Sequence, residues 1–214
     1  YNRLFDLDGT LLNTIDDLAD SANRVCAAHG WPQYETAQYR YFVGNGIPKL
    51  VERFSLRTAA APRSWPPHWP SLTKYRRAHA RQDSALPRIP ELLARLKAAG
   101  VKMAVFSNKA DEFAAPWWPA TLTPTCLDRA RRIARCTDQA RDPRHPRADG
   151  KLGVTPDGSV LYVGDSNVDA DTAHNAGLPC CGVLWGFRTR EELTAAGAEY
   201  LAEDAAALEK VILE

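Results

Sequence analysis

The sequence predicts an α/β fold in which a parallel sheet carries an inserted helical segment. Short apolar segments alternate with amphipathic segments of about ten residues, a pattern typical of βαβ units. Polar residues follow three of the apolar segments directly, at Asp6, Ser107 and Asp165. A long, mainly helical stretch separates the first strand from the second. We therefore predict an α/β core over residues 1–13 and 86–214, with a helical cap inserted over residues 14–85.

The N-terminal region begins with a strand that ends in a glycine turn, over Leu4–Thr10. A helix follows, because Asn13 or Thr14 can cap it and Gly30 can end it. Its apolar residues recur at helical spacing, at Ile15, Leu18, Ala22 and Val25. A second helix is expected from near Ile47 through Phe54.

The C-terminal half contains the remaining core elements. A helix is expected over Pro90–Ala99, because proline suits the first turn and Gly100 can end the helix. Strands are expected at Val101–Phe106, Val160–Val163 and Cys181–Leu184. Further helices are expected near Val168–Ala176, Arg190–Ala196 and Ala205–Ile212.

Two stretches, residues 56–88 and 114–150, lack sustained periodicity apart from a possible helix near Leu127–Ala134. Loops this long are uncommon in a compact domain. Disorder also fits poorly, because both stretches contain tryptophan. One hypothesis is that compensating reading-frame errors altered the recorded sequence there. Peptide mass mapping tests it, and complete matching peptides across both stretches would contradict it.

Composition narrows the range of partners and locations. The formal net charge is +1, with 27 basic and 26 acidic residues intermixed, so neither nucleic acid nor an anionic membrane is an expected partner. The apolar runs are too short for a membrane span, and no signal peptide is visible. Five cysteines without a C-x-x-C pattern favour free thiols in a reducing cytoplasm.

Asp6 and Asp8 form the first reactive pair. Carboxylates two residues apart at a strand end can share one face and repel each other unless a cation lies between them. Oxygen ligands at this density suit Mg²⁺. Gly9 permits a sharp turn beside a ligand, and Thr10 adds a hydroxyl. The alternative is an ordinary D-x-D-G turn.

Two further strand ends carry polar residues. Ser107 offers a hydroxyl and backbone N–H groups to a phosphoryl oxygen, but alone this is a weak signal, because Ser-Asn after a strand is usually a turn or a helix cap. Asp165 could complete a metal site. Asp169 lies four residues later, where it could order the loop or a metal-bound water. The alternative for this pair is a helix N-cap with a solvated carboxylate.

The chain resembles the haloacid dehalogenase superfamily in these motifs. An apolar strand followed by D-x-D-G-T occurs at Leu4–Thr10, a strand ending in serine at Ser107, and G-D with a later aspartate at Gly164, Asp165 and Asp169. The resemblance covers about residues 1–55, 86–113 and 151–214. It implies a Rossmann-like parallel core with a helical cap.

The resemblance also implies site roles. Asp6 would attack phosphorus, and Asp8 would act as general acid and base. Asp6, the backbone carbonyl of Asp8 and Asp165 would hold Mg²⁺, with Asp169 beside them. Ser107 would bind a phosphoryl oxygen. Thr10 and Asn108 would also contact substrate.

The family's third motif, a lysine usually followed by proline, has no clear counterpart. Lys151 is the candidate, and its alternative is a surface lysine at a helix end. Other cations could take the place of this lysine. Arg144 and Arg147 lie closer to its expected position, and Lys109 follows Ser107-Asn108.

Two segments resemble phosphoglycolate phosphatases: Val43–Gly46, and Gly182–Arg188 followed by Arg190–Leu193. The resemblance implies a cap that closes over a small phosphorylated metabolite, most simply 2-phosphoglycolate. The sequence leaves monomer and homodimer open as oligomeric states. Gly44 and Gly46 could let the cap backbone approach the substrate carboxylate. The alternatives are a β-phosphoglucomutase-like sugar phosphomutase, a non-catalytic phosphate-binding relative and a receiver-like protein.

Overall fold

A computed structural model describes residues 2–45, 47–55, 84–107, 129–132 and 159–214. The chain forms two compact units, one from Tyr1–Leu12 with Ala85–Glu214 and the other from Asn13–Ser84. Within the described ranges, no helix combines the length and the apolar character that crossing a membrane requires.

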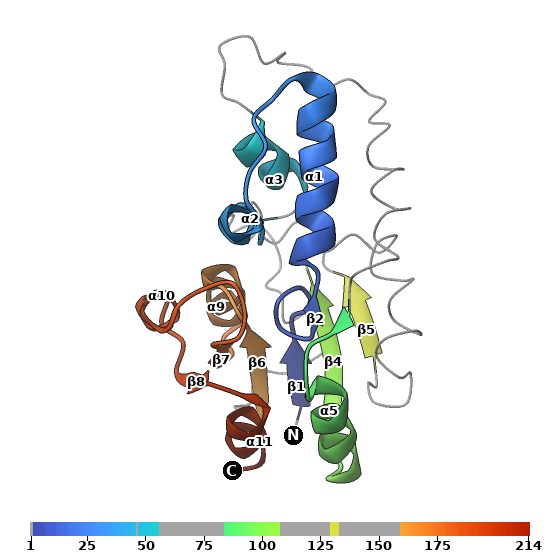
Figure 1. Ribbon diagram of the computed structural model, residues 1–214. Helices are drawn as coiled ribbons and strands as arrows, with labels where there is room; N and C mark the ends of the chain where they lie inside the picture. The colour runs from blue at the N-terminus through green and yellow to red at the C-terminus, as the bar shows by residue number, and fades with distance from the viewer. Residues whose placement is uncertain (1, 46, 56–83, 108–128, 133–158) are drawn as a thin grey trace. The chain divides into compact units, whose positions relative to one another are not determined.

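The first unit contains a six-stranded parallel sheet in the order β5-β4-β1-β6-β7-β8 (Figure 1). The strands are β1 (Asn2–Phe5), β4 (Lys102–Ser107), β5 (Arg129–Arg132), β6 (Val160–Gly164), β7 (Cys180–Val183) and β8 (Tyr200–Ala202). The predicted α/β class with a parallel sheet is confirmed. Strand β1 lies between β4 and β6, so residues that follow these three neighbours meet at one edge of the sheet.

Four helices of the first unit are described: α5 (Ile89–Ala98), α9 (Asn167–Asn175), α10 (Arg190–Ala195) and α11 (Ala205–Leu213). Side chains alternate between the two faces of the sheet, as the pleat requires. Phe5 and Val105 pack in one apolar cluster with the leucines of α5 and Leu208 of α11. Leu4 and Phe106 pack on the other face against alanines of α9.

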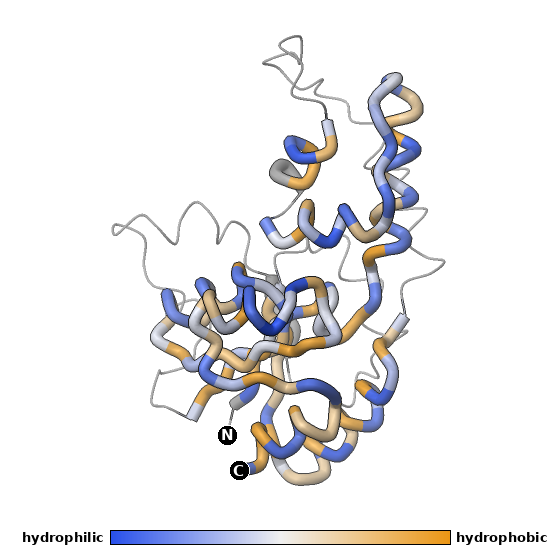
Figure 2. The backbone as a smooth tube through the Cα atoms, turned by 60° about the vertical axis from the view of Figure 1, so that its left-hand side comes forward, coloured by the Kyte–Doolittle hydropathy of each residue, from blue (hydrophilic) through white to orange (hydrophobic). Residues whose placement is uncertain are grey.

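The helices present mixed surfaces, with hydrophobic and hydrophilic positions alternating within their turns (Figure 2).

Pro90 lies in the first turn of α5, and Gly100 follows the helix in a left-handed conformation with φ +79°. Both features agree with the sequence prediction for this helix.

The predicted helix over Leu127–Ala134 is wrong, because Arg129–Arg132 form strand β5. This segment pairs in parallel with β4 along its whole length, from Ala104 opposite Arg129 to Ser107 opposite Arg132. Pairing with an existing strand edge supplies hydrogen bonds that local sequence pattern cannot reveal, so tertiary context overrides propensity here. Strand β8 also pairs at a sheet edge and was not predicted.

The second unit contains, within its described part, helices α1 (Ile15–His29), α2 (Thr36–Phe42) and α3 (Ile47–Phe54). Gly30 ends α1 with φ +67°, as predicted, whereas α2 was not predicted. Asn23 on α1 connects this helix to α2 and to the segment before it. Its side chain forms hydrogen bonds with the backbone of Tyr34 and with the hydroxyl of Tyr39. The rings of Tyr34, Tyr39 and Phe42 pack edge to face around that contact.

The chain passes between the units through two short paired strands, β2 (Leu12–Asn13) and β3 (Ser84–Ala85). The Leu86 N–H donates to the carbonyl of Leu11 at 3.0 Å, beside this pair. The unpredicted ribbon therefore ties the two crossings together where they leave the sheet-containing unit. Residues 56–83, 108–128 and 133–158 lie outside the described ranges, and so does most of the two stretches without sustained periodicity.

Candidate active site

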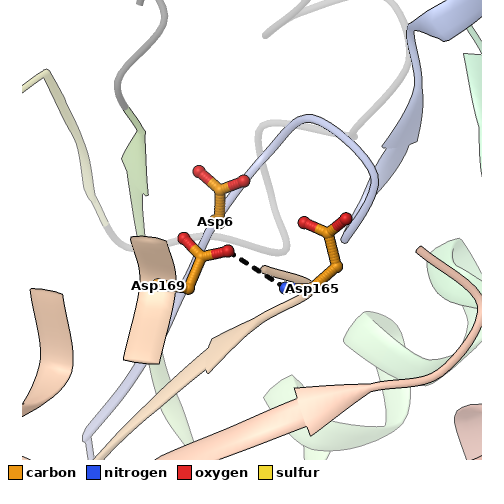
Figure 3. Close-up of side chains that lie close together, drawn as sticks. All are labelled: Asp6, Asp165 and Asp169. Carbon is orange, nitrogen blue, oxygen red and sulfur yellow. Dashed lines mark hydrogen bonds between the residues drawn. The ribbon is translucent and has the colours of Figure 1, made fainter. Parts of the chain in front are cut away.

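Three aspartates gather at the carboxyl edge of the parallel sheet (Figure 3). Asp6 follows β1, Asp165 follows β6, and Asp169 lies in the first turn of α9. One carboxylate oxygen from each lies within 4.8 Å of the others. Asp165 and Asp169 are buried, and Asp6 is partly exposed. The parallel neighbours β1 and β6 therefore bring residues more than 150 positions apart into one cluster.

Asp6 is held beside β6 by the backbone. Its N–H donates to the carbonyl of Val163 at 2.8 Å, which continues the β1–β6 ladder past the end of β1. Gly9 follows with φ +88°, a left-handed conformation that glycine adopts without strain. The predicted strand and glycine turn thus place the Asp6 carboxylate at the sheet edge.

Asp169 orders the turn between β6 and α9. Its Oδ2 accepts hydrogen bonds from the N–H of Asp165 at 3.1 Å, the N–H of Ser166 at 3.0 Å and the hydroxyl of Ser166 at 2.7 Å. Ser166 and Asp169 form a capping box at the start of α9. The Tyr162 hydroxyl lies 3.4 Å from Asp169 Oδ1. These contacts order the turn, and they place Ser166 at the N-cap with Asp169 as a buried rather than a solvated carboxylate.

Asp165 receives one hydrogen bond on each carboxylate oxygen. The Thr10 hydroxyl donates to Oδ1 at 3.4 Å, and the Phe187 N–H donates to Oδ2 at 2.7 Å. These donors come from the loops after β1 and β7 respectively. Three separate strand ends therefore define the position of this carboxylate.

The electrostatics of the cluster are unfavourable without a cation. Burial, followed by repulsion from the neighbouring carboxylates, raises the pKa of Asp6 well above its ordinary value. Burial and the charge of Asp169 raise the pKa of Asp165 to about 8. Burial also raises the pKa of Asp169, although its hydrogen bonds with Ser166 act in the opposite direction. Several carboxylate oxygens that repel one another in a buried site fit a hard divalent cation such as Mg²⁺.

The remaining predicted site residues fall into two groups. Ser107 is buried at the end of β4, next to β1, and Asp8 is partly exposed after β1, outside the three-carboxylate group. Gly44 belongs to the second unit and has φ +108°. The predictions for Asn108, Lys151 and Gly46 fall on residues outside the described ranges.

Several contributors to the site were not identified from the sequence. The capping partner Ser166 carries a local signal, since serine followed three residues later by an acidic residue is a capping-box pattern. Trp185 and Phe187 lie within the Gly182–Arg188 segment, but neither of them was assigned to the site from the sequence. The Phe187 contact has no sequence signal, because the donor is a backbone N–H that any residue type except proline would offer.

Comparisons with known proteins agree with this geometry. The haloacid dehalogenase-like hydrolase family matches residues 3–183. A phosphoglycolate phosphatase of Cupriavidus necator is 32% identical over 210 residues, covering 96% of this chain and 90% of the relative. An N-acetylmuramic acid 6-phosphate phosphatase of Pseudomonas aeruginosa is 30% identical over 189 residues, covering 86% and 81% respectively.

Among solved structures, a Lactobacillus delbrueckii subsp. bulgaricus protein proposed to be a phosphoglycolate phosphatase superposes with a TM-score of 0.79. The two proteins are 27% identical, and the match covers 99% of this chain and 98% of the Lactobacillus protein. The resemblance inferred from the three strand-end motifs is confirmed. With its acidic strand ends joined at one edge of a parallel sheet, this chain belongs to the haloacid dehalogenase-like hydrolase family.

Proposed function

We propose that this protein is a Mg²⁺-dependent phosphatase that hydrolyses a small phosphorylated metabolite through an aspartyl-phosphate on Asp6. The observation that carries the proposal is the grouping of Asp6 with Asp165 and Asp169 at the carboxyl edge of the sheet. Relatives named as phosphatases, similar over most of the chain, make it a phosphoric monoester hydrolase.

In the proposed reaction, a carboxylate oxygen of Asp6 attacks phosphorus while the bond to the ester oxygen breaks. Asp8 gives its proton to the leaving oxygen, and the alcohol departs. Asp8 then accepts a proton from water, whose oxygen attacks the phosphorus of the aspartyl-phosphate. Inorganic phosphate leaves, and Asp6 regains its carboxylate. Asp8 is suited to this exchange because it is partly exposed and lies two residues from the nucleophile.

The residues that would hold Mg²⁺ are Asp6, Asp165 and the backbone carbonyl of Asp8, with Asp169 ordering the turn that carries Asp165. When bound, the cation supplies positive charge against the phosphoryl oxygens. The raised pKa values of the three carboxyl groups support this assignment, because a cation would favour their ionised forms.

Ser107 is proposed to donate its hydroxyl to a phosphoryl oxygen from the end of β4. Asn108 and Lys151 are proposed as further contacts to the phosphoryl group. Thr10 is also proposed near the substrate, and its hydroxyl is bonded to Asp165 in this structure. The Thr10 contact supports a role in holding the metal ligand as well.

We propose that the second unit, with the boundaries predicted at residues 14–85, acts as a cap over a two-carbon phosphate such as 2-phosphoglycolate. The left-handed conformation of Gly44 supports close approach of backbone to ligand, and Gly46 would contribute in the same way. The free, buried thiols of Cys26, Cys180 and Cys181 support the predicted cytoplasmic location.

A sugar phosphate is the second candidate substrate. The relative named as an N-acetylmuramic acid 6-phosphate phosphatase favours it, because its identity to this chain is close to that of the phosphoglycolate phosphatases. Both substrates present a phosphoryl group with a carboxylate elsewhere in the molecule, so the same core chemistry would serve either one.

The test measures phosphate release from 2-phosphoglycolate and from N-acetylmuramic acid 6-phosphate, with and without Mg²⁺. The protein is compared with Asp6→Asn and with Asp171→Asn, which alters an exposed carboxylate on α9. We expect Mg²⁺-dependent release that Asp6→Asn abolishes and Asp171→Asn preserves. Release that survives Asp6→Asn would exclude the proposed nucleophile, and the ratio of the two kcat/KM values decides the substrate.

A further inference from the structure

The segment Trp185–Phe187, which follows β7, lies directly against the acidic cluster. Its Phe187 N–H donates to Asp165 Oδ2 at 2.7 Å. The indole N–H of Trp185 donates to the carbonyl of Thr10 at 3.1 Å, and the hydroxyl of Thr10 donates to the other oxygen of Asp165. The segment therefore joins the loop after β1 to the carboxylate after β6.

Two glycines make this contact possible. A Cβ added at Gly186 would lie 2.5 Å from Asp165 Oδ2 and would overlap the Asp165 Cβ. A Cβ added at Gly9 would also lie 2.5 Å from that oxygen, and 2.8 Å from the ring of Phe187. Real Cβ atoms do not approach other heavy atoms so closely, so the Asp165 carboxylate fills the space that two missing side chains leave.

We propose that the backbone of Gly186 and Phe187 is a positioning element that holds the Asp165 carboxylate in the orientation required to bind the cation. Trp185 anchors this element to the loop that follows Asp6. The inference rests on the proposed metal-dependent function and deepens it, because it assigns the orientation of one ligand to a segment that itself offers no side-chain ligand to the metal.

Mg²⁺ requires nearly octahedral coordination, so a carboxylate that rotates away from the site binds it weakly. Groups that orient a metal ligand typically change metal affinity about 10- to 100-fold when they are altered. The Phe187 N–H fixes one oxygen of Asp165, and Thr10 fixes the other. Close packing against Gly186 removes the space into which the carboxylate could turn.

The test variant is Gly186→Ala, and the matched control is Gly182→Ala. Gly182 lies on β7, just before the proposed element. A Cβ there would meet side-chain carbons of Leu193 and Leu201 at 3.0 Å each, and its three nearest neighbours are all leucine carbons. Both substitutions add one methyl group to a crowded site, so the control measures general overpacking.

Mg²⁺ binding is measured on the protein alone, by calorimetric titration and by the rise in Tm with Mg²⁺ concentration. For Gly186→Ala we expect at least about a 10-fold increase in the Mg²⁺ dissociation constant. For Gly182→Ala we expect a lower Tm with a Mg²⁺ dissociation constant within about twofold of the original. Activity of Gly186→Ala should recover towards that of the unaltered protein at high Mg²⁺.

Trp185→Phe is the second variant, and it keeps the inference testable if Gly186→Ala fails to fold. It preserves an aromatic ring but removes the N–H that bonds Thr10. We expect Mg²⁺ affinity to fall about fivefold, a smaller change than for Gly186→Ala. The lost hydrogen bond joins two neutral groups and affects Asp165 only through Thr10.

Unchanged Mg²⁺ affinity in the folded variants would overturn the inference, and so would an equal loss in Gly186→Ala and Gly182→Ala. Either result would leave the proposed function intact if the unaltered protein still bound Mg²⁺ and released phosphate. If the unaltered protein bound no Mg²⁺, the proposed metal site and this inference would both be wrong.

Discussion

The body of the sheet and its carboxyl edge are built from the same strands but follow opposite rules. Along β1, Leu4 and Phe5 are buried in apolar clusters on the two faces. One residue later, Asp6 joins Asp165 and Asp169 in a group of mutually repelling carboxylates. The body of the sheet stabilises the fold, whereas the edge concentrates charge that burial penalises.

This difference indicates how the unit tolerates its acidic edge. Asp169 is stabilised by three hydrogen bonds to the turn before α9, and Asp165 by one on each oxygen. Asp6 is repelled by three other aspartates, and this repulsion adds to burial in raising its pKa. Removing charge at the edge should therefore favour folding and harm function, whereas removing apolar volume from the body should harm folding first.

The largest expected effect comes from Asp6→Asn. Loss of the proposed nucleophile should lower kcat by about 10⁴-fold or more. The same change should raise the Tm of the Mg²⁺-free protein, because one of the repelling carboxylates becomes neutral. Phosphate release and thermal unfolding measured on one preparation check both parts. A lower Tm in the absence of Mg²⁺ would show that repulsion at this edge does not limit stability.

Leu92→Ala tests the body of the sheet-containing unit. Leu92 is fully buried on α5 in the apolar cluster that covers one face. The substitution should lower the free energy of unfolding by about 2–5 kcal/mol, through lost burial and a cavity. Leu213→Ala is the control, because Leu213 is 52% exposed and its change should stay within about 0.5 kcal/mol. Urea unfolding distinguishes the two, and equal effects would contradict the assignment of the core.

The pH dependence of the stability of the Mg²⁺-free protein is a second test of the acidic edge. The pKa of Asp165 is about 8 in the folded protein and about 3.9 when unfolded. Between these values the folded state binds more protons, so stability is greatest at low pH and falls as pH rises towards 8. We expect the free energy of unfolding to decrease steadily between pH 5 and pH 8.

Two comparisons sharpen this measurement. Saturating Mg²⁺ should reduce the loss of stability with rising pH, because a bound cation favours the ionised carboxylates. Asp165→Asn should also reduce it in the absence of metal. A fall of the same size in Asp165→Asn would assign the pH dependence to other groups.

Asp204→Ala should have the smallest effect. Asp204 caps α11 by accepting a hydrogen bond from the Ala207 N–H at 2.8 Å, and it does not belong to the three-carboxylate group. Its loss should cost about 1 kcal/mol of stability without changing kcat. Asp204→Asn should restore most of the loss, because asparagine is an equally good N-cap. Thermal unfolding compares the three proteins, and a change in kcat would link this cap to the site.

Elements with strong local patterns were predictable from the sequence. The helices near α1, α5 and α9 and the strands β4, β6 and β7 follow their periodicity and their glycine or proline boundaries within a few residues. Arg129–Arg132 was assigned wrongly, because an edge strand formed by pairing with β4 has little pattern of its own. The short helix α2 was missed, although a capping box at Glu35 and Gln38 marks its start.

The sequence alone determined the chemistry available at the site: carboxylates after two strands, a serine at the end of a third and an aspartate four residues beyond Asp165. Local spacing is enough for this, because each residue is placed by its own strand or turn. Only the tertiary structure decided which oxygens face one another and what holds them. The donor to Asp165 Oδ2 lies 22 residues away on the backbone, and Thr10 lies 155 residues away. Such contacts depend on the order of strands in the sheet, which no local pattern encodes.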